Sequence, residues 1–232
     1  MNIALVGYGS MGHMVEGKAR ERGHSIVTIV NEHHSGLDAE GLADSLRAAD
    51  VAIDFTAAAA VLRNVEACMT AGVPMVEGTT GWTTELDAIR SLVEAKNGAL
   101  VYGANFSIGV NLFYRMVEHA SNLLARFPEY EVFIEEQHHS KKKDAPSGTA
   151  LKLRDVVAGH FESGFSVSST RAGHIPGTHR VGFDGPADQI LLEHTARSRE
   201  GFALGAVMAA EWIIGKRGFF EFTAAMDEII AK

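Results

Sequence analysis

The chain of 232 residues contains a single cysteine, Cys68, which excludes a disulfide framework and a cysteine-rich metal site. It has only five prolines and shows no internal repeat or low-complexity linker. No apolar run approaches the ~20 residues of a membrane span, and Met1 leads into a strand-like segment without a signal-peptide pattern. We therefore expect a cytoplasmic protein that does not enter a membrane.

The charge balance also excludes a class of partners. The formal net charge of −8 argues against nucleic acid as the main partner, although it permits a locally basic pocket. With 46% hydrophobic and 22% charged residues, the composition is that of an ordinary globular protein. The length allows one large domain or two small ones.

The N-terminus carries a dinucleotide-binding pattern. The apolar run Asn2–Val6 predicts a buried parallel strand, and a GxGxxG segment, helix and second strand follow it. In this glycine loop (Gly7–Gly12), the glycines permit a tight turn, approach of a pyrophosphate and close helix–strand packing. Glu32 lies about twenty residues further on, where an acidic side chain binds the adenosine ribose. The residues predicted to hold the cofactor here are Gly7, Tyr8, Gly9, Ser10, Met11, Gly12 and Glu32.

Strands and helices continue to alternate up to about Phe106, which predicts a parallel sheet with helices on both faces. Ligands of such sheets bind beyond the carboxyl ends of the strands. Two further loops follow predicted strands there, although the first is equally compatible with a plain turn and helix cap. Their residues are Gly78, Thr79, Thr80, Ala104, Asn105, Phe106 and Ser107.

The pattern changes after Ser107 to two helices and four strands, before two apolar helices end the chain at 201–214 and 220–230. The predicted fold class is α/β: a Rossmann-type parallel sheet with helices on both faces, plus an inserted α+β domain with an open, largely antiparallel sheet. The dinucleotide-binding domain is expected at 1–106, completed by helices at about 206–232. Residues 107–205 are expected to bind substrate and to form oligomer contacts.

The His–Lys segment (Glu136–Ala150) combines two imidazoles, three ammonium groups and a helix start within fifteen residues. Ser147 is a candidate N-cap, which places the backbone N–H groups of Gly148 and Thr149 at a helix N-terminus suited to an anion. His138 and its neighbour add groups that exchange protons near pH 7. Composition alone leaves open a solvated lysine run and an ordinary turn.

These residues resemble the 4-hydroxy-tetrahydrodipicolinate reductase (dihydrodipicolinate reductase) family over nearly the full length. The signature Glu-x-His-His-x-x-Lys-x-Asp-x-Pro-Ser-Gly-Thr is complete from Glu136 to Thr149, and the loops at 78–80 and 104–107 are similar to nicotinamide-site segments. The resemblance implies reduction of a cyclic dicarboxylate by NADH or NADPH in lysine and diaminopimelate biosynthesis, by a homotetramer built through the second domain. It further implies His138 as the acid–base residue, Lys142 as the proton donor, and His139, Gly148 and Thr149 as substrate-binding residues.

Two departures bear on this resemblance. Relatives often have Arg or Lys where Ser10 stands, and Glu32 favours a free ribose hydroxyl, so the sequence leans to NADH with dual use open. His33 and His34 partly compensate if they are protonated. Relatives also often carry Asn at the position of Leu204, a change without a functional interpretation here.

Two other functions are compatible with the N-terminal pattern. One is a different small NAD(P)-dependent amino-acid-pathway dehydrogenase, which does not need the complete His–Lys segment. The other is a non-catalytic dinucleotide-sensing regulator, which binds cofactor without turnover.

No metal is expected, because the cofactor carries the hydride and the remaining histidines make no metal-ligand spacing. Arg197 and Arg199 share a face if their strand persists, and then contact substrate or a neighbouring subunit.

Overall fold

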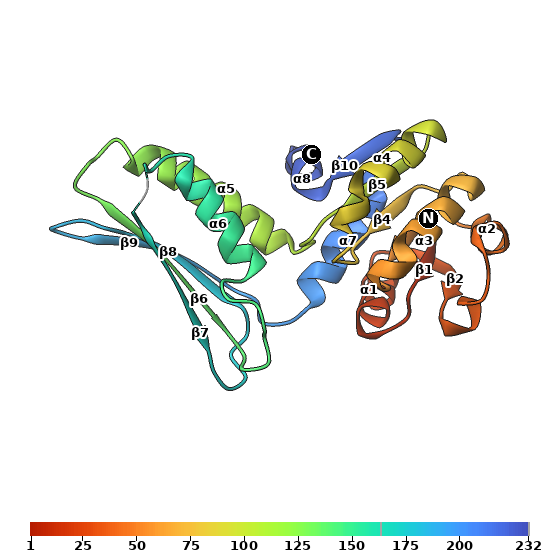
Figure 1. Cartoon of the computed structure of the whole chain (residues 1–232), viewed down its shortest axis with the longest axis horizontal. Coiled ribbons are helices and arrows are strands. Elements are labelled where there is room, and N and C mark those ends of the chain that lie inside the picture. Colours follow the sequence, from red (N-terminus) through yellow and green to blue (C-terminus); the bar gives the residue numbers. More distant parts are fainter. Residues whose placement is uncertain (163, 232) are drawn as a thin grey trace. The chain divides into compact units, whose positions relative to one another are not determined.

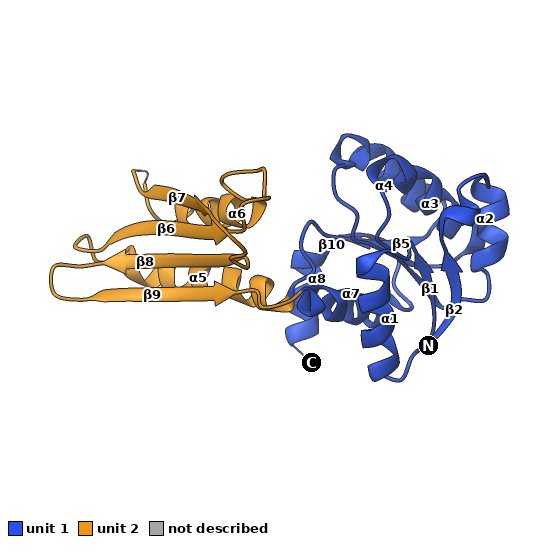
Figure 2. Ribbon diagram, turned by 90° about the horizontal axis from the view of Figure 1, so that it is seen from below, with its two compact units in different colours: residues 1–107, 199–232 blue, residues 108–198 orange. Residues whose placement is uncertain are grey.

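A computed structural model of the chain describes residues 1–162 and 164–231. The chain separates into two compact units, coloured in Figure 2. Unit 1 contains residues 1–107 and 199–232, and unit 2 contains residues 108–198. Each unit has its own sheet and its own hydrophobic core.

Unit 1 is built on a six-stranded, entirely parallel sheet in the order β10-β5-β4-β3-β1-β2 (Figure 1). Its strands are β1 (Asn2–Val6), β2 (Ser25–Val30), β3 (Val51–Asp54), β4 (Met75–Glu77), β5 (Ala99–Tyr102) and β10 (Gly218–Glu221). Its helices are α1 (Ser10–Glu21), α2 (Ala39–Leu46), α3 (Ala58–Ala71), α4 (Leu86–Ala95), α7 (Glu200–Ile213) and α8 (Phe222–Ile230), with short 3₁₀ turns η1 (Glu32–His34) and η2 (Thr83–Glu85). The predicted Rossmann-type sheet is confirmed.

Burial explains why these segments form strands. Every residue of β3 and β4 is buried, as expected for strands of a parallel sheet that helices cover on both faces. Helix α3 packs against both α2 and α4, and all three contribute to one core, while α1 contacts α7. Strand β1 pairs with β2 on one side and β3 on the other, so the chain order reverses at β1. Crevices for ligands form at such a point, beyond the carboxyl ends of the strands.

Unit 2 places two helices on one face of a four-stranded sheet in the order β7-β6-β8-β9. Strands β6 and β7 are parallel and the other pairs are antiparallel, so the sheet is mixed and largely antiparallel. Its elements are α5 (Ile108–Leu124), β6 (Glu131–His138), α6 (Gly148–Ala158), β7 (Ser166–Arg171), β8 (Thr178–Asp184) and β9 (Gln189–Thr195). Its core joins both helices to the inward residues of β6 and β8.

Some sequence-based boundaries were wrong. The helix expected at 220–230 begins only at Phe222, because residues 218–221 form β10 against β5. Helix α2 was not expected; Asp38 caps it by accepting from the N–H of Gly41 (2.8 Å). Strand β9 ends at Thr195, so Arg197 and Arg199 do not share a strand face. Among the described residues, no helix is long and apolar enough to cross a membrane.

Candidate active site

The glycine loop of unit 1 has the geometry that its sequence predicts. Gly7 has φ +88°, and a Cβ added to this glycine would lie 2.4 Å from the carbonyl oxygen of Phe55. A Cβ on Gly12 lies 2.4 Å from the carbonyl oxygen of Gly7, so the turn and the helix start require both glycines. Gly9 differs, because a Cβ there meets nothing within 4 Å. Gly9 is the N-cap of α1 and no side chain caps that helix, which leaves an N-terminus suited to a phosphate group.

Two cavities of unit 1 adjoin this loop. The first, the Glu32 cavity, has a volume of about 330 Å³, and the second, the Thr79 cavity, about 350 Å³. They share Gly9 and Thr56, so together they run along the carboxyl ends of the strands and suit an elongated ligand. The Glu32 cavity is lined by Val6, Gly7, Tyr8, Gly9, Val30, Asn31, Glu32, Ser35, Thr56 and Arg63. The Thr79 cavity is lined by Gly9, Ser10, Met11, Phe55, Thr56, Ala57, Gly78, Thr79 and Thr80.

The predicted cofactor residues differ in whether they line these cavities. Tyr8 lines the Glu32 cavity, but its hydroxyl donates to Glu16. Phe106 is 2% exposed and packs its ring 4.5 Å from that of Phe222. The loop Ala104–Ser107 contributes no residue to either cavity; within it, the N–H of Ser107 donates to Oδ1 of Asn105 (2.9 Å).

In unit 2, Glu136 organises the start of the His–Lys segment. Its side chain is 1% exposed, and Oε2 contacts Nδ1 of His138. Its other oxygen, Oε1, accepts from Nη2 of Arg171 (2.6 Å) and from the N–H of Ser147 (3.3 Å). Arg171 also donates to the carbonyl oxygen of Asp144 (2.5 Å), so one guanidinium ties the segment to β6 and β7.

The pKa values in this cluster follow from burial and charge. Burial by itself raises the pKa of Glu136, but hydrogen bonds from Arg171 and Ser169 outweigh it and lower the pKa to about 2. Burial lowers the pKa of His138, and the Glu136 carboxylate partly restores it. The cluster therefore contains a permanent carboxylate that orients one ring nitrogen of an imidazole, an arrangement suited to acid–base chemistry.

Ser147 connects this cluster to helix α6. Its hydroxyl accepts from the N–H of Ala150 (3.2 Å) as the N-cap, and it lies 3.0 Å from Nε2 of His179. His179 is 4% exposed and packs edge-on against the His138 ring at 5.1 Å; burial lowers the pKa of His179 to about 4. Gly148 opens the helix, and a Cβ there meets nothing within 4 Å. A carboxylate or phosphate is the ligand that such an end attracts.

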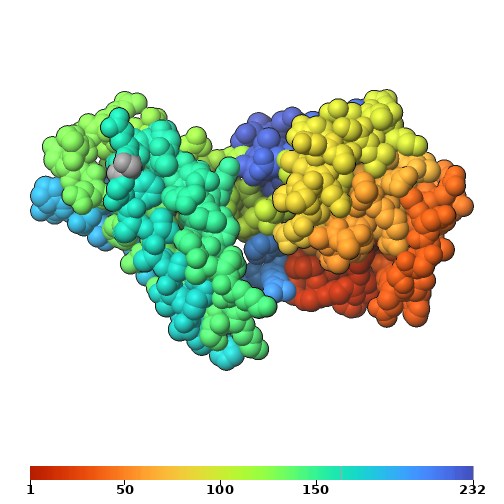
Figure 3. Space-filling view, in the orientation of Figure 1, coloured from red at the N-terminus to blue at the C-terminus, as the bar shows by residue number. Residues whose placement is uncertain are grey.

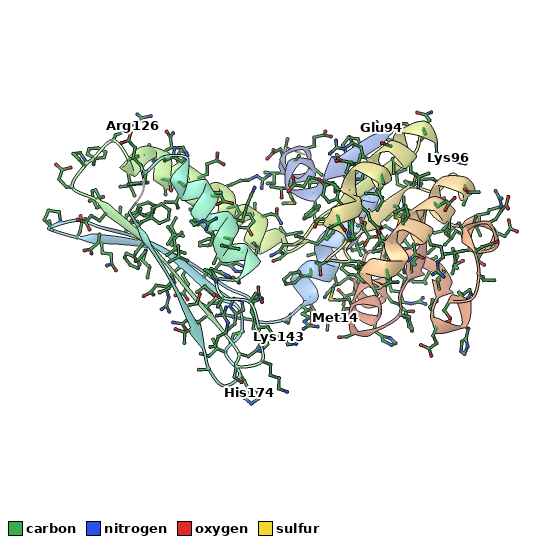
Figure 4. All side chains as sticks on the ribbon, in the orientation of Figure 1. Met14, Glu94, Lys96, Arg126, Lys143 and His174 are labelled. Atoms are coloured by element: carbon green, nitrogen blue, oxygen red, sulfur yellow. The ribbon has the colours of Figure 1, made fainter. Side chains whose placement is uncertain are left out.

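The lysines and the second histidine lie outside the buried part of the cluster. Nζ of Lys142 pairs with Oδ1 of Asp144 at 2.9 Å, and the side chain is 25% exposed. His139 and Lys143 are exposed, and Figure 3 shows this part of the chain, in green, on the surface of unit 2. Figure 4 shows Lys143 and His174 at the same end of the four-stranded sheet. The structure thus brings Lys142 beside the buried cluster without placing His139 in it.

Glu136, His138 and His179 also offer ligand atoms within 4.8 Å of one another, a donor set of the type that zinc takes. In the structure both Glu136 oxygens already accept hydrogen bonds, and the positive charge of Arg171 lies beside them. These contacts form a hydrogen-bonded network, which suits proton chemistry better than a cation.

Three residues of these sites were missed by sequence reasoning: Arg63, Arg171 and His179. They lie far along the chain from the motifs that they contact, on α3, β7 and β8. Strand register supplies the missing information, because His179 is the cross-strand partner of Glu136 and Arg171 is the parallel partner of His138.

Comparison with known families accounts for both units. Residues 1–106 match the family model described as dihydrodipicolinate reductase, N-terminus, and residues 109–226 match dihydrodipicolinate reductase, C-terminus. A 4-hydroxy-tetrahydrodipicolinate reductase of Christiangramia forsetii is 36% identical over 244 residues, covering 99% of each chain. One from Archaeoglobus fulgidus is 37% identical over 264 residues, covering 99% of this chain and 100% of the relative.

Solved structures show the same fold. A dipicolinate-bound dihydrodipicolinate reductase from Paenisporosarcina sp. TG-14 aligns with a TM-score of 0.79 at 23% identity, covering 95% of this chain and 97% of that one. An amine dehydrogenase from Mycobacterium smegmatis aligns with a TM-score of 0.63 at 12% identity, covering 96% of this chain and 95% of that one. At these identities the likeness concerns the fold alone.

Proposed function

Because the chain belongs to the dihydrodipicolinate reductase family, its reaction is the NAD(P)H-dependent reduction of 4-hydroxy-tetrahydrodipicolinate, and we propose that His138 and Lys142 carry the proton chemistry. The reaction belongs to lysine and diaminopimelate biosynthesis. In this proposal unit 1 holds the dinucleotide and unit 2 holds the dicarboxylate.

The residues of unit 1 fit a dinucleotide. The open space at Gly9 and the N-terminus of α1 receive the pyrophosphate, and Glu32 binds a ribose hydroxyl. Gly78, Thr79 and Thr80 line the adjoining cavity, on the side assigned to the nicotinamide. Ala104–Ser107 line neither cavity, and their assignment to the nicotinamide rests on the resemblance of this segment to the family's. The bound cofactor supplies a hydride to ring C4. The uncharged Ser10 and the acidic Glu32 support NADH as the better reductant, with NADPH also used.

In unit 2 the N-terminus of α6 binds one substrate carboxylate through Gly148 and Thr149. The exposed His139 contacts the substrate ring away from that carboxylate. The product lacks the 4-hydroxyl, so that group would leave as water and give a conjugated ring before C4 receives the hydride. Hydride addition at C4 would then place negative charge on the ring system, which a protonated group must quench. Lys142 donates that proton, because its ammonium group lies at the edge of the cluster beside Asp144. His138 acts as the acid–base group, with Glu136 holding its Nδ1.

The single observation that carries this assignment is the Glu136–His138 contact beside the helix N-terminus that Ser147 caps. The test is oxidation of NADH and of NADPH with substrate made in situ from pyruvate and aspartate semialdehyde. Lys142→Ala is expected to lower kcat by about 10²- to 10⁴-fold. Lys143→Ala, a neighbouring exposed lysine, is the matched control and is expected to stay close to wild type.

Two results oppose the assignment. If Lys142→Ala and Lys143→Ala lose activity equally, the lysines only raise the local positive potential and Lys142 is not the donor. If the folded wild-type protein binds dinucleotide but oxidises neither cofactor, the sensing regulator replaces the reductase. Dinucleotide binding measured by calorimetry separates that second outcome from a preparation that is simply inactive.

We also propose a homotetramer assembled through unit 2. The sheet face opposite α5 and α6 carries Leu191, which is 46% exposed, beside Phe133 and Gly182 in register. Glu135, Arg180 and Glu193 form the next row, in which Arg180 pairs with Glu193. An apolar row flanked by charges on an open sheet suits contact with a second copy. Light scattering tests this proposal, since a monomer mass contradicts it.

A further inference from the structure

Arg63 brings an unexpected positive charge to the Glu32 cavity. It lies on α3, about thirty residues beyond Glu32, yet both residues line the same cavity together with Ser35. Ser10 lines only the Thr79 cavity. His33 is absent from the lining, and His34 is held by Asn31 in a reciprocal capping box. The cation in this cavity is therefore Arg63 rather than either histidine.

The contacts of Arg63 hold its guanidinium in place without neutralising it. Nη1 donates to the carbonyl oxygens of Ser35 (3.0 Å) and Leu37 (3.3 Å). Nε and Nη2 donate to Oδ1 of Asn64, at 3.3 and 3.0 Å. All these acceptors are uncharged, and among the described residues no carboxylate lies within ion-pair distance of Arg63. One N–H of Nη2 is left over after these bonds.

We propose that Arg63 binds the 2′-phosphate of NADPH, while Glu32 binds the free 2′-hydroxyl of NADH, so that one cavity accepts both cofactors. The proposal rests on the dinucleotide site described above. An acidic side chain at the end of the second strand disfavours a 2′-phosphate by like-charge repulsion, and a nearby arginine relieves this repulsion. Because Arg63 is already fixed by neutral acceptors, little side-chain entropy is lost when the phosphate binds.

Two other roles for Arg63 make a different prediction. A purely structural role, in which Arg63 ties residues 35–37 to α3, affects both cofactors equally. So does stacking of the guanidinium on the adenine ring, which NADH and NADPH share. Discrimination between the two cofactors is therefore the property to measure, and binding reports it without any dependence on turnover.

The experiment measures the Kd of NAD⁺ and of NADP⁺ by calorimetry for wild type, Arg63→Gln and Arg63→Lys. Arg63→Gln is expected to weaken NADP⁺ binding by about 10- to 100-fold and NAD⁺ binding by less than about twofold. Arg63→Lys retains the charge and recovers part of the loss. The matched control is Arg47→Gln, which replaces an exposed arginine that follows the neighbouring helix α2 as its C-cap and pairs with Asp44. This variant is expected to change neither Kd.

Glu32→Gln provides a second variant with the opposite expectation. Within residues 1–162 and 164–231, Glu32 makes no ion pair that its loss disrupts. It is expected to weaken NAD⁺ and to leave NADP⁺ unchanged or tighter. Equal weakening of both cofactors by Arg63→Gln overturns the proposal in favour of a structural or stacking role. Unchanged binding of both also overturns it. If wild type binds neither dinucleotide, the cofactor site itself is wrong and this proposal falls with it.

Discussion

Asp54 and Glu77 lie side by side in register on the neighbouring parallel strands β3 and β4, and both are fully buried. Asp54 accepts from Nδ2 of Asn64 (2.7 Å) and from the hydroxyl of Thr79 (3.3 Å). Oε1 of Glu77 accepts from the N–H of Thr79 (2.7 Å), whereas Oε2 has no donor facing it among the described residues. Two buried carboxyl groups at paired strand positions disfavour each other's ionisation, so we expect this pair to share a proton.

Burial raises the pKa of Asp54, and burial followed by the charge of Asp54 raises the pKa of Glu77 well above its usual value. The pair thus holds Thr79, which lines the Thr79 cavity, through hydrogen bonds. The raised pKa values mean that the two carboxyl groups together carry fewer than two negative charges. The loop that follows β3 joins the same network, because the N–H of Thr56 donates to Oγ1 of Thr79 (3.0 Å). We expect this pair to position the loop without entering the chemistry.

Glu77→Gln is predicted to make stability less dependent on pH. The raised pKa means that the folded state binds more protons than the unfolded state above about pH 4, so wild-type stability falls as pH rises. The glutamine carbonyl keeps the bond from Thr79, and its amide donates to Asp54 in place of the shared proton. The variant should match wild type near pH 4 and exceed it by about 1–3 kcal/mol at pH 8 in urea unfolding.

Glu94→Gln is the matched control for this measurement, because Glu94 is exposed on α4 (Figure 4). It is expected to follow the wild-type curve at every pH. Parallel stability curves for Glu77→Gln and wild type contradict the shared proton.

Glu136→Gln is predicted to move the alkaline limb of the kcat profile to lower pH. The Glu136 carboxylate stays ionised throughout the assay range, since its pKa is about 2, and its charge raises the pKa of His138 against the effect of burial. Removing that charge lowers the pKa of His138, so the protonated imidazole is lost at lower pH. At pH 8, kcat is expected to fall by up to about 100-fold.

Glu135→Gln tests whether the effect is specific, because residue 135 faces the opposite side of the same strand and approaches Arg180. Its pH profile should stay that of wild type. If both variants shift equally, or neither does, His138 is not the titrating acid.

Local patterns predicted what local geometry determines. The glycine loop, the N-cap at Ser147 and the alternation of strands and helices are each set by residues adjacent in the chain, and the structure has all three. The short strand β10 was not predicted from the sequence, because its four residues form a strand only through pairing with β5, more than a hundred residues earlier. Tertiary pairing overrides local propensity in such a segment.

The same distinction applies to the candidate site. Sequence spacing identified Glu136, His138 and Lys142 within one segment, but it did not identify Arg171, whose guanidinium fixes Glu136 from β7. The sequence offered His33 and His34 as positive groups beside Glu32, whereas the positive side chain that lines the Glu32 cavity is Arg63. Partners that arrive through sheet register or from another helix leave no signal in a single sequence.

Gly9→Ala is predicted to weaken dinucleotide binding without changing stability. The backbone of Gly9 is extended, with φ −85° and ψ −158°, and its Cβ position is empty, so neither conformation nor packing requires glycine there. The remaining reason for glycine is the close approach of a pyrophosphate, which a methyl group blocks. The Kd of either dinucleotide should rise by about 10-fold or more, while Tm stays near wild type.

Two further variants, Gly17→Ala and Gly12→Ala, serve as controls for this prediction. Gly17 lies in the exposed interior of α1 with an empty Cβ position, so alanine there should add about 0.5–1 kcal/mol of stability and leave Kd unchanged. Gly12→Ala should instead destabilise the fold, because its Cβ meets the carbonyl oxygen of Gly7 at 2.4 Å. If Gly9→Ala binds dinucleotide as tightly as Gly17→Ala, the pyrophosphate does not approach this loop. The cofactor would then lie elsewhere, and Glu32 and Thr79 would lose their assigned roles with it.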